Sequence, residues 1–500
     1  MSGETNKQII IIGGGMGGLS AAALLAREGF EVTLLERAAA VGGKMRRVEV
    51  DGGFVDGGPT VVTMRWLFEG LFAALGARLE QEVQLRSAEI LHRHAWTDGA
   101  VLDLYSDLDR SVEAIRAFAG EQDAEGYRRF VSYAEEIFKA VETPFIESPK
   151  PSLLDMTKHF RGQGLKSVGK IDFSRTMWKA LETFFRDPRL RQLFGRYATY
   201  YGSSPFQAPG TLNLIAHVER KGVWLVEGGI YNLARALEKL AIRQGVTVRC
   251  DAEVARIRVH KKRVVGVTLA SGEALPADAV VCNADVAALA EGLFGEEPRK
   301  ASGAPSRQDR SLSAVTWCLK ARTSGFPLVF HNVFFSEDYP AEFDNILKNG
   351  RLPDAPTVYI CAQDRDRFDD APMEGEERLL VLVNAPPRGD YQPLSEDALQ
   401  TCERQTFDLL RRCGLEVHRR PGASVRTTPT DFAALFPATG GALYGPITHG
   451  WRASFKRPGT RTRVGGLYLA GGSVHPGAGV PMVTQSGVIA AEAVVADLAR

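Results

Sequence analysis

Residues 7–20 read KQIIIIGGGMGGLS, and this stretch decides the fold. Four consecutive isoleucines bounded by glycine are typical of a strand buried on both faces of a parallel sheet. Gly13, Gly15 and Gly18 then fit the pattern G-x-G-x-x-G, and the alanine- and leucine-rich run Leu19–Glu28 predicts a helix. Such glycines permit a tight turn, close approach of a pyrophosphate, and close packing of helix on strand. The helix N-terminus then faces the phosphates with the positive end of its dipole.

A second strand and an acid complete the motif. Glu31–Leu35 is another apolar run, and Glu36 follows it, about twenty residues beyond the glycines. A carboxylate at this position accepts hydrogen bonds from both ribose hydroxyls of a dinucleotide. Strand, glycine loop, helix, strand and acid in this order predict a Rossmann-type domain, and a purely structural glycine turn is the less favoured alternative.

The residues after Glu36 narrow the cofactor. Arg37 and the stretch VGGKM, residues 41–45, add a second glycine pair followed by a cation, which domains that bind only NAD do not need. Together with GGFVDGGPTVVT, residues 52–63, this region resembles the superfamily of flavin-dependent amine oxidases and carotenoid desaturases. The resemblance implies that the basic residue lies near the flavin diphosphate and that the later segment passes close to the flavin ring. The alternative is that Arg37 and Lys44 are ordinary surface cations.

The same resemblance implies that residues 222–285 also belong to the flavin domain. Their sequence pattern predicts a strand, a Gly-Gly turn, a helix and further strands. The backbone of Val254 is then expected beside the adenine. The FAD-binding residues implied by this part of the chain are Gly13, Gly15, Met16, Gly17, Gly18, Glu36, Arg37, Gly43, Lys44, Met45, Gly58, Pro59, Thr60 and Val254.

The second glycine-rich stretch, LAGGSVHPGAGVPMVTQSG, occupies residues 469–487. It follows a predicted strand at Leu467–Ala470 and precedes a predicted terminal helix from about Met482, so it repeats the order of the N-terminus. A second close backbone approach can donate N–H groups to the flavin carbonyls and phosphate. The candidates are Gly471, Gly472, Val480, Pro481, Met482 and Val483. A surface loop rich in glycine and proline is the alternative.

We therefore expect an α/β fold with a discontinuous FAD-binding domain. Strand-like runs such as SAVTWCLKA and RLLVLVNAP, with a helix at Glu396–Arg412, predict an α+β substrate domain built on a mixed sheet. The predicted boundaries are 1–84, 219–288 and 456–500 for the FAD domain, 85–125 and 289–455 for the substrate domain, and 126–218 for a helical, membrane-facing subdomain.

The stretch HPGAGVPM, residues 475–482, resembles the C-terminal signature of the bacterial phytoene desaturase family. Within that family, residues 58–72 and 91–104 are most similar to the hydroxyneurosporene, or 1-hydroxycarotenoid 3,4-, desaturases. The resemblance implies non-covalent FAD and a carotenoid substrate. It also implies removal of two hydrogens from adjacent carbons, with the hydride moving to flavin N5. A C3–C4 double bond would form in a 1-hydroxy or 1-methoxy carotenoid such as 1-hydroxyneurosporene.

Several alternatives remain open at this point. A phytoene-type desaturase, a carotenoid isomerase and a flavin amine oxidase share the flavin motifs. A flavin-free escort protein of the Rab escort type would share the architecture, but the retained glycines and Glu36 argue against it.

The catalytic residues are less well marked than the cofactor residues, because no Ser/His/Asp array and no metal-ligand spacing is present. His475 is the candidate base or flavin-orienting donor, and a structural histidine is the alternative. Asp56, Arg65 and His94 are candidates to meet a substrate hydroxyl. Where the protein mainly positions a substrate on a flavin, no elaborate acid–base array is needed.

The composition of the chain argues against several classes of protein. The net charge of +1 gives no reason to expect a nucleic-acid partner, and the six cysteines form no C-x-x-C pair. No apolar run reaches about 18 residues, so no spanning segment is expected. We therefore expect a cytoplasmic protein with reduced thiols.

Residues 150–200 hold eleven Lys and Arg against four Asp and Glu, with eight aromatic residues interleaved. Cations near an anionic surface and aromatics at the headgroup boundary favour binding to the inner membrane, where a carotenoid would be dissolved. A membrane quinone or oxygen would take the electrons. Helices whose aromatics are core and whose cations are solvated are the alternative.

Overall fold

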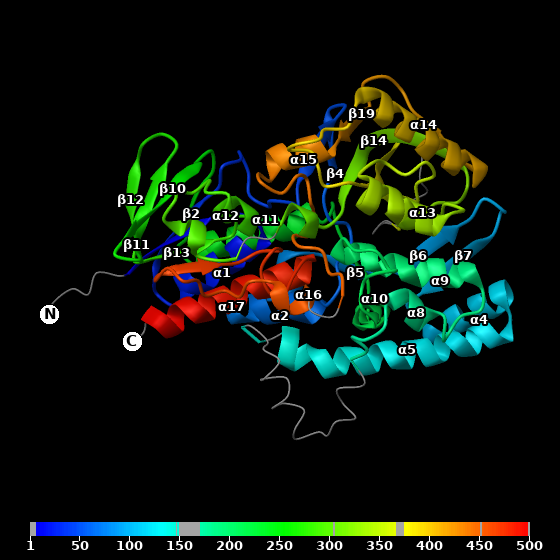
Figure 1. Ribbon diagram of the computed structural model, residues 1–500, viewed down its shortest axis with the longest axis horizontal. Coiled ribbons are helices and arrows are strands. Elements are labelled where there is room, and N and C mark those ends of the chain that lie inside the picture. The colour runs from blue at the N-terminus through cyan, green and yellow to red at the C-terminus, as the bar shows by residue number, and fades with distance from the viewer. Residues whose placement is uncertain are drawn as a thin grey trace.

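The computed structural model describes residues 7–146, 148–149, 171–303, 306–366, 375–450 and 453–498. Figure 1 shows three regions: a parallel sheet with its helices near both termini, a larger sheet on the opposite side, and a group of helices below that larger sheet.

The four isoleucines form the central strand of a five-stranded parallel sheet, as the sequence predicts. The strand order is β20 (Leu467–Leu469), β13 (Ala279–Cys282), β1 (Gln8–Ile12), β2 (Glu31–Leu35) and β9 (Thr247–Arg249). Every pairing in this sheet is parallel. The carboxyl ends of its strands therefore meet at one edge, where ligands of such sheets bind.

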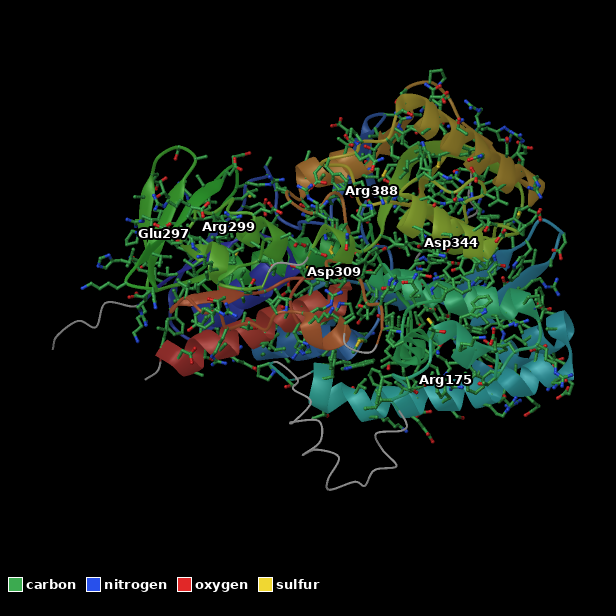
Figure 2. The ribbon with its side chains drawn as sticks, in the orientation of Figure 1. Arg175, Glu297, Arg299, Asp309, Asp344 and Arg388 are labelled. Atoms are coloured by element: carbon green, nitrogen blue, oxygen red, sulfur yellow. The ribbon has the colours of Figure 1, made fainter. Side chains whose placement is uncertain are left out.

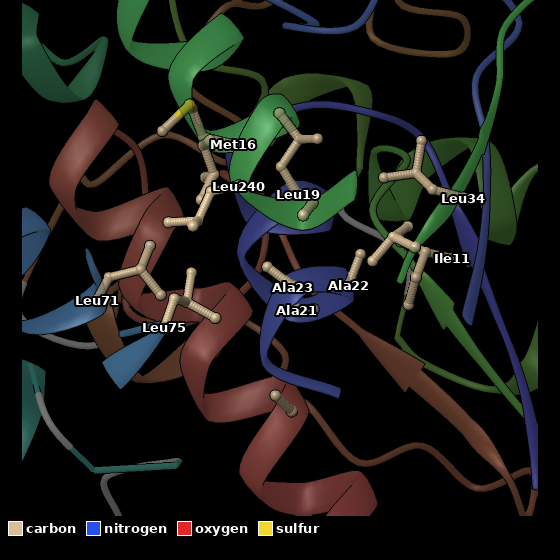
Figure 3. Close-up of a cluster of buried hydrophobic side chains, with 14 of the residues drawn as sticks. Ile11, Met16, Leu19, Ala21, Ala22, Ala23, Leu34, Leu71, Leu75 and Leu240 are labelled. Atoms are coloured by element: carbon tan, nitrogen blue, oxygen red, sulfur yellow. The ribbon is translucent and has the colours of Figure 1, made fainter. Parts of the chain in front are cut away.

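Three helices cover this sheet: α1 (Met16–Arg27), α11 (Tyr231–Arg243) and α17 (Val480–Leu498). Figure 3 shows Leu19 and Leu240 in the core that they form with strand residues such as Ile11. A Cβ on residue 487 would lie 2.2 Å from the Gly17 carbonyl oxygen, so α17 can pack on α1 only because Gly487 has no side chain. The two ends of the chain thus lie side by side (Figure 1).

The second sheet joins the two predicted pieces of the substrate domain. Its strand order is β18 (Leu415–His418), β14 (Ser313–Gly325), β17 (Glu377–Ala385), β16 (Val358–Ala362), β15 (His331–Phe334), β6 (Ile90–Ala95) and β7 (Val101–Tyr105), with β19 (Ser424–Thr427) also on β14. β15 and β6 run parallel whereas their neighbours pair antiparallel, which confirms the predicted mixed sheet. The helix predicted at Glu396–Arg412 is α14, with those bounds.

The helical region packs on one face of this sheet. It contains α4 (Leu108–Ala119), α5 (Glu121–Val141), α8 (Met177–Leu181), α9 (Pro188–Gly195) and α10 (Leu214–Arg220). Among its predicted membrane aromatics, Phe185, Phe194 and Tyr197 are buried in the core, whereas Phe173 is 41% exposed. Arg175, labelled in Figure 2, pairs with Asp172 at 2.7 Å. The described part of residues 150–200 therefore uses most of its aromatics for packing.

The remaining elements connect these regions. They are β3 (Arg47–Val50), β4 (Gly53–Asp56), α2 (Arg65–Ala74), α3 (Leu79–Glu82), β5 (Leu85–Ser87), β8 (Trp224–Val226), β10 (Val254–His260), β11 (Arg263–Leu269), β12 (Ala274–Pro276), α12 (Val286–Ala290), α13 (Tyr339–Phe343), α15 (Pro429–Leu435) and α16 (Ala453–Lys456). Within the described ranges, no helix is both long enough and apolar enough to cross a bilayer.

Candidate functional site

The N-terminus of α1 is built to face an anion. Its N-cap is Gly15, no side chain caps it, and no acid stands in its first turn. The N–H groups of that turn, Met16 to Gly18, are therefore available to a phosphate. A Cβ on residue 18 would lie 2.1 Å from the Gly13 carbonyl oxygen, so only glycine permits this turn.

Glu36 lies at the carboxyl end of β2, as the sequence predicts. Its Oε2 accepts the Gly14 N–H at 2.7 Å and its Oε1 accepts the Ala38 N–H at 2.9 Å. The side chain is 8% exposed, so these two bonds fix the carboxylate beside the glycine loop. Each carboxylate oxygen has a further lone pair with which to accept a ribose hydroxyl.

The start of β10 lies beside the same acid. The backbone N–H of Ala252 donates to the Glu36 carbonyl at 2.9 Å, and that of Asp251 donates to the Ala38 carbonyl at 3.0 Å. Val254 follows two residues later and is buried. Its backbone therefore lies on the adenine side of the expected site, and its contact with adenine stays a prediction.

Asn283 is a site residue that the sequence analysis missed. It follows β13 directly, and its Nδ2 donates to the Gly13 carbonyl at 3.1 Å. A Cβ on Gly17 would lie 2.7 Å from Asn283 Oδ1, and one on Gly471 would lie 3.0 Å from it, so this amide stands between the two glycine loops. Its Oδ1 is buried and has no donor in the described part of the chain. A single asparagine after a predicted strand forms no recognisable motif, so the sequence does not indicate that Asn283 lies between the two glycine loops.

The C-terminal glycine loop adjoins the first loop. The Gly471 N–H donates to Ser486 Oγ at 3.1 Å, and a Cβ on Gly17 would lie 3.0 Å from the Val483 carbonyl oxygen. The structure thus brings together the two motifs that the sequence separates by more than four hundred residues. The Gly472 carbonyl accepts a bond from Arg457 at 2.7 Å, which holds this loop in place.

The four predicted donors at the start of α17 are not equivalent. Pro481 has no N–H group, and the Val483 N–H donates to the Gly479 carbonyl at 2.9 Å. Val480 and Met482 are therefore the better candidates to donate an N–H, and contact of the four residues with a flavin stays a prediction.

The two predicted phosphate cations make contacts with the 434–443 segment. Lys44 Nζ donates to the Leu443 carbonyl at 2.7 Å and lies 5.3 Å from the Phe436 ring centroid. Burial lowers the pKa of Lys44, with Arg457 adding to the effect and Asp285 opposing it. Their role at the diphosphate stays a prediction.

Arg37 donates to the carbonyls of Ala434, at 2.8 Å, and Leu435. Both cations therefore tie the FAD domain to the segment around α15.

The Gly58–Thr60 segment packs tightly on the second glycine pair. A Cβ on Gly58 would lie 1.9 Å from the Lys44 carbonyl oxygen and 3.3 Å from Met45 Cα, so the backbone at Gly58 packs against Lys44 and Met45. Met45 is buried at this contact. Beyond Pro59, Thr60 Oγ1 lies 2.7 Å from the Tyr359 hydroxyl, which links the FAD domain to the second sheet.

Asp56, at the end of β4, is also buried. Burial raises its pKa, and Arg47, 3.7 Å away, acts in the opposite direction. Its backbone is bound on both sides by the Gln363 amide, at 3.0 and 2.8 Å. Asp56 is therefore anchored in the structure, and its contact with a substrate hydroxyl stays a prediction.

His475 is fully buried in the C-terminal loop. Its Nε2 lies 2.7 Å from the Phe145 carbonyl oxygen, and its ring meets the Phe145 ring edge-on at 4.8 Å. Because a carbonyl only accepts, Nε2 carries the proton in this arrangement. Nδ1 is then the unprotonated ring nitrogen, and the role of His475 as a base stays a prediction.

The two predicted substrate residues lie in different environments. Arg65 pairs with Glu69 at 2.7 Å and with Glu80, and it stacks on Trp224 at 4.4 Å. His94 is buried on β6, where burial lowers its pKa to about 3, so the ring is neutral. Their contact with a substrate stays a prediction for both.

These features together define a dinucleotide-binding oxidoreductase. A glycine loop and an uncapped helix N-terminus fit a diphosphate, and Glu36 fits a ribose. No donor among the described residues reaches the buried Asn283 oxygen between the loops. Two helix N-termini converge where FAD needs polar contacts, so the residues present fit FAD. Within the described residues, no cluster of His, Cys, Asp and Glu could hold a metal ion.

Comparisons with known proteins agree with this class. Residues 16–495 match the family of flavin containing amine oxidoreductases, and the chain belongs to that family. FAD is therefore its cofactor.

Three curated relatives that match nearly the whole chain are named hydroxyneurosporene desaturase. The one from Rubrivivax gelatinosus is 49% identical, over 98% of this chain and 94% of the relative. The one from Cereibacter sphaeroides is 46% identical, over 98% of both chains. Putrescine oxidase is similar in structure, with a TM-score of 0.61 at 14% identity over 99% of this chain and 100% of the other. At that identity the likeness concerns the fold alone.

Proposed function

We propose that this protein is an FAD-dependent carotenoid desaturase that introduces the C3–C4 double bond into a 1-hydroxy or 1-methoxy carotenoid such as 1-hydroxyneurosporene. The observation that carries the proposal is the 49% identity, along nearly the whole chain, to a protein named for desaturation of hydroxyneurosporene. The cofactor cradle described above supports it, because the α1 N-terminus, Glu36 and the C-terminal glycine loop lie together.

Bound FAD supplies the hydride acceptor for this dehydrogenation. The protein's own residues hold and orient the reactants. Glu36 and the α1 N-terminus would hold the ribose and the diphosphate of the dinucleotide, and the adjoining C-terminal loop would supply further backbone contacts. His475 is our candidate to take the proton at Nδ1 from the carbon next to the oxidised one. Its contact with Phe145 fixes the ring for that task.

Purified holoenzyme with 1-hydroxyneurosporene in liposomes tests the proposal. The expected product has lost two hydrogens, absorbs at longer wavelength, and carries the new double bond next to the hydroxylated end. Phytoene, supplied in the same way, is the control substrate. Desaturation of phytoene without desaturation of 1-hydroxyneurosporene would instead make the protein a phytoene-type desaturase.

We also propose peripheral binding to the cytoplasmic face of the inner membrane, with a membrane quinone rather than oxygen as the electron acceptor. Lys150, Lys158, Arg161, Lys166 and Lys170 support this, although they lie outside the described residues. Arg175 and Lys179 are already paired, with Asp172 at 2.7 Å and Glu182 at 3.1 Å.

The pairing provides a matched control for a liposome sedimentation experiment. Changing Lys166 and Lys170 to glutamine should reduce binding to anionic liposomes, because cations near such a surface contribute about 1 kcal/mol each. Changing Arg175 and Lys179 should reduce it less. Wild-type protein that stays in the supernatant at low salt would exclude the membrane proposal. Anaerobic turnover with a quinone, but not without one, would support the proposed acceptor.

A further inference from the structure

Six polar side chains, four of them buried and two half-buried, form a continuous cluster between the second sheet and the helical region. We name it the histidine cluster. Its members come from six different parts of the chain and are Thr60, His92 on β6, Tyr200, Glu219 on α10, His331 on β15 and Tyr359 on β16. None of the cofactor contacts described above uses it, apart from its first residue, Thr60.

Short contacts link the cluster from end to end. The Tyr359 hydroxyl lies 2.7 Å from both Thr60 Oγ1 and His331 Nδ1. The His331 ring stacks on that of His92, with 5.0 Å between centroids. The Tyr200 hydroxyl lies 3.2 Å from His92 Nε2.

Glu219 is the last member of this series of contacts, and its Oε2 lies 3.6 Å from His92 Nδ1. One end of the cluster therefore lies on the segment expected at the flavin ring, and the other on α10.

The cluster contains more polar atoms than it has hydrogen bonds. Within the described residues, His92 Nδ1, His331 Nε2 and both oxygens of Glu219 are buried and make no hydrogen bond of ordinary length and angle. The Tyr197 and Tyr200 hydroxyls lie close enough to Glu219 to act on its pKa as hydrogen-bond donors. Nη1 of the neighbouring buried Arg196 also lacks a partner. Buried polar groups are normally paired, so this concentration marks a place where a polar ligand group or ordered water is received.

The protonation states favour a neutral ligand group. Burial lowers the pKa of His92 to about 3 and that of His331 well below its usual value, so both rings are neutral. Burial raises the pKa of Glu219 to about 7, against the lowering effects of the two tyrosine hydroxyls and Arg196. Near neutral pH the carboxyl can both donate and accept, which matches an alcohol.

We propose that the histidine cluster binds the tertiary hydroxyl at the end of the substrate, with the Glu219 carboxyl and the unpaired ring nitrogens of His92 and His331 as its partners. This rests on the proposed function. In a 1-hydroxycarotenoid the carbon that bears the hydroxyl is two bonds from C3, so the hydroxyl must bind close to the flavin ring. Tyr359 and Thr60 connect the His331 end of the cluster to the segment expected there, and His92 and Glu219 lie further along it.

Glu219 is then a specificity residue, which two variants test. Glu219→Leu keeps the volume but neither donates nor accepts, whereas Glu219→Gln keeps both abilities. Tyr339→Phe is the matched control, because it removes another buried, unpaired hydroxyl outside the cluster. FAD content and melting temperature establish that each variant is folded and loaded.

The experiment compares 1-hydroxyneurosporene with neurosporene, which lacks the hydroxyl, in binding titrations followed by carotenoid absorption and in kcat/KM. Glu219→Leu should reduce the preference for the hydroxylated substrate by about tenfold or more, because a site built for a hydroxyl rejects the analogue that lacks it. Glu219→Gln and Tyr339→Phe should keep the preference.

Two outcomes overturn the inference: an unchanged preference in Glu219→Leu, or an equal loss for both substrates, which would indicate a structural role with water in the cluster. Failure of the wild-type enzyme to desaturate either substrate would refute the proposed function instead.

Discussion

Replacing Glu36 with alanine should strongly weaken FAD binding. Two ribose hydroxyls would lose a charged acceptor, at about 1.5–3 kcal/mol each, so the loss is about 3–6 kcal/mol. That corresponds to a dissociation constant raised by a factor of roughly 10² to 10⁴. The same substitution leaves the N–H groups of Gly14 and Ala38 without their acceptor, so the apoprotein should also unfold more easily.

The assay is titration of the apoprotein with FAD, followed by the quenching of flavin fluorescence. Glu36→Gln is the matched control, because its carbonyl oxygen replaces one of the two acceptors without the charge. The dissociation constant of Glu36→Gln for FAD should lie between those of the wild type and Glu36→Ala. An unchanged dissociation constant for Glu36→Ala, with the protein still folded, would refute the placement of the ribose at this acid.

Three further predictions follow from the site. Asn283→Leu removes the hydrogen bond to the Gly13 carbonyl and should weaken FAD binding by about tenfold. Asn283→Asp should weaken FAD binding more, because it adds a negative charge beside the diphosphate. FAD titration of both variants shows which has the larger dissociation constant. His475→Ala should lower the rate of flavin reduction, measured in a single turnover, by a larger factor than it lowers FAD occupancy. Equal losses in both quantities would mean that His475 has only a structural role. Because the pKa of Glu219 is raised in the folded state, the free energy of unfolding should fall by up to about 3 kcal/mol as pH rises from about 4.5 to about 7. Denaturant titrations across this pH range should show a smaller fall for Glu219→Gln. The same fall in the variant and the wild type would contradict this prediction.

The FAD domain could be predicted from the sequence because local patterns determine it. The four isoleucines and the glycines specify β1 and the start of α1 without reference to other residues. Glu36 follows at a fixed spacing. The predicted helix at Glu396–Arg412 is equally local, since its apolar positions recur with helical period and Ser395 caps it.

The missed residues depend on contacts between distant parts of the chain. Asn283 acquires a role only when β13 pairs with β1, and Arg457 only when the 444–446 segment folds over the C-terminal loop. The histidine cluster joins six different parts of the chain, so no local pattern marks Glu219 or His331. Similarly, the aromatics of residues 173–200 could belong to a membrane surface or a core by composition alone, and tertiary packing placed Phe185 and Phe194 in the core.

The most direct test of the proposed function is to offer the purified, FAD-loaded protein 1-hydroxyneurosporene and phytoene separately, and to identify the products by mass and absorption. We predict a product two hydrogens lighter from 1-hydroxyneurosporene, with the new double bond between C3 and C4, and no comparable product from phytoene. Desaturation of phytoene alone, or no loss of hydrogen from either carotenoid by a fully FAD-loaded enzyme with an electron acceptor present, would contradict it.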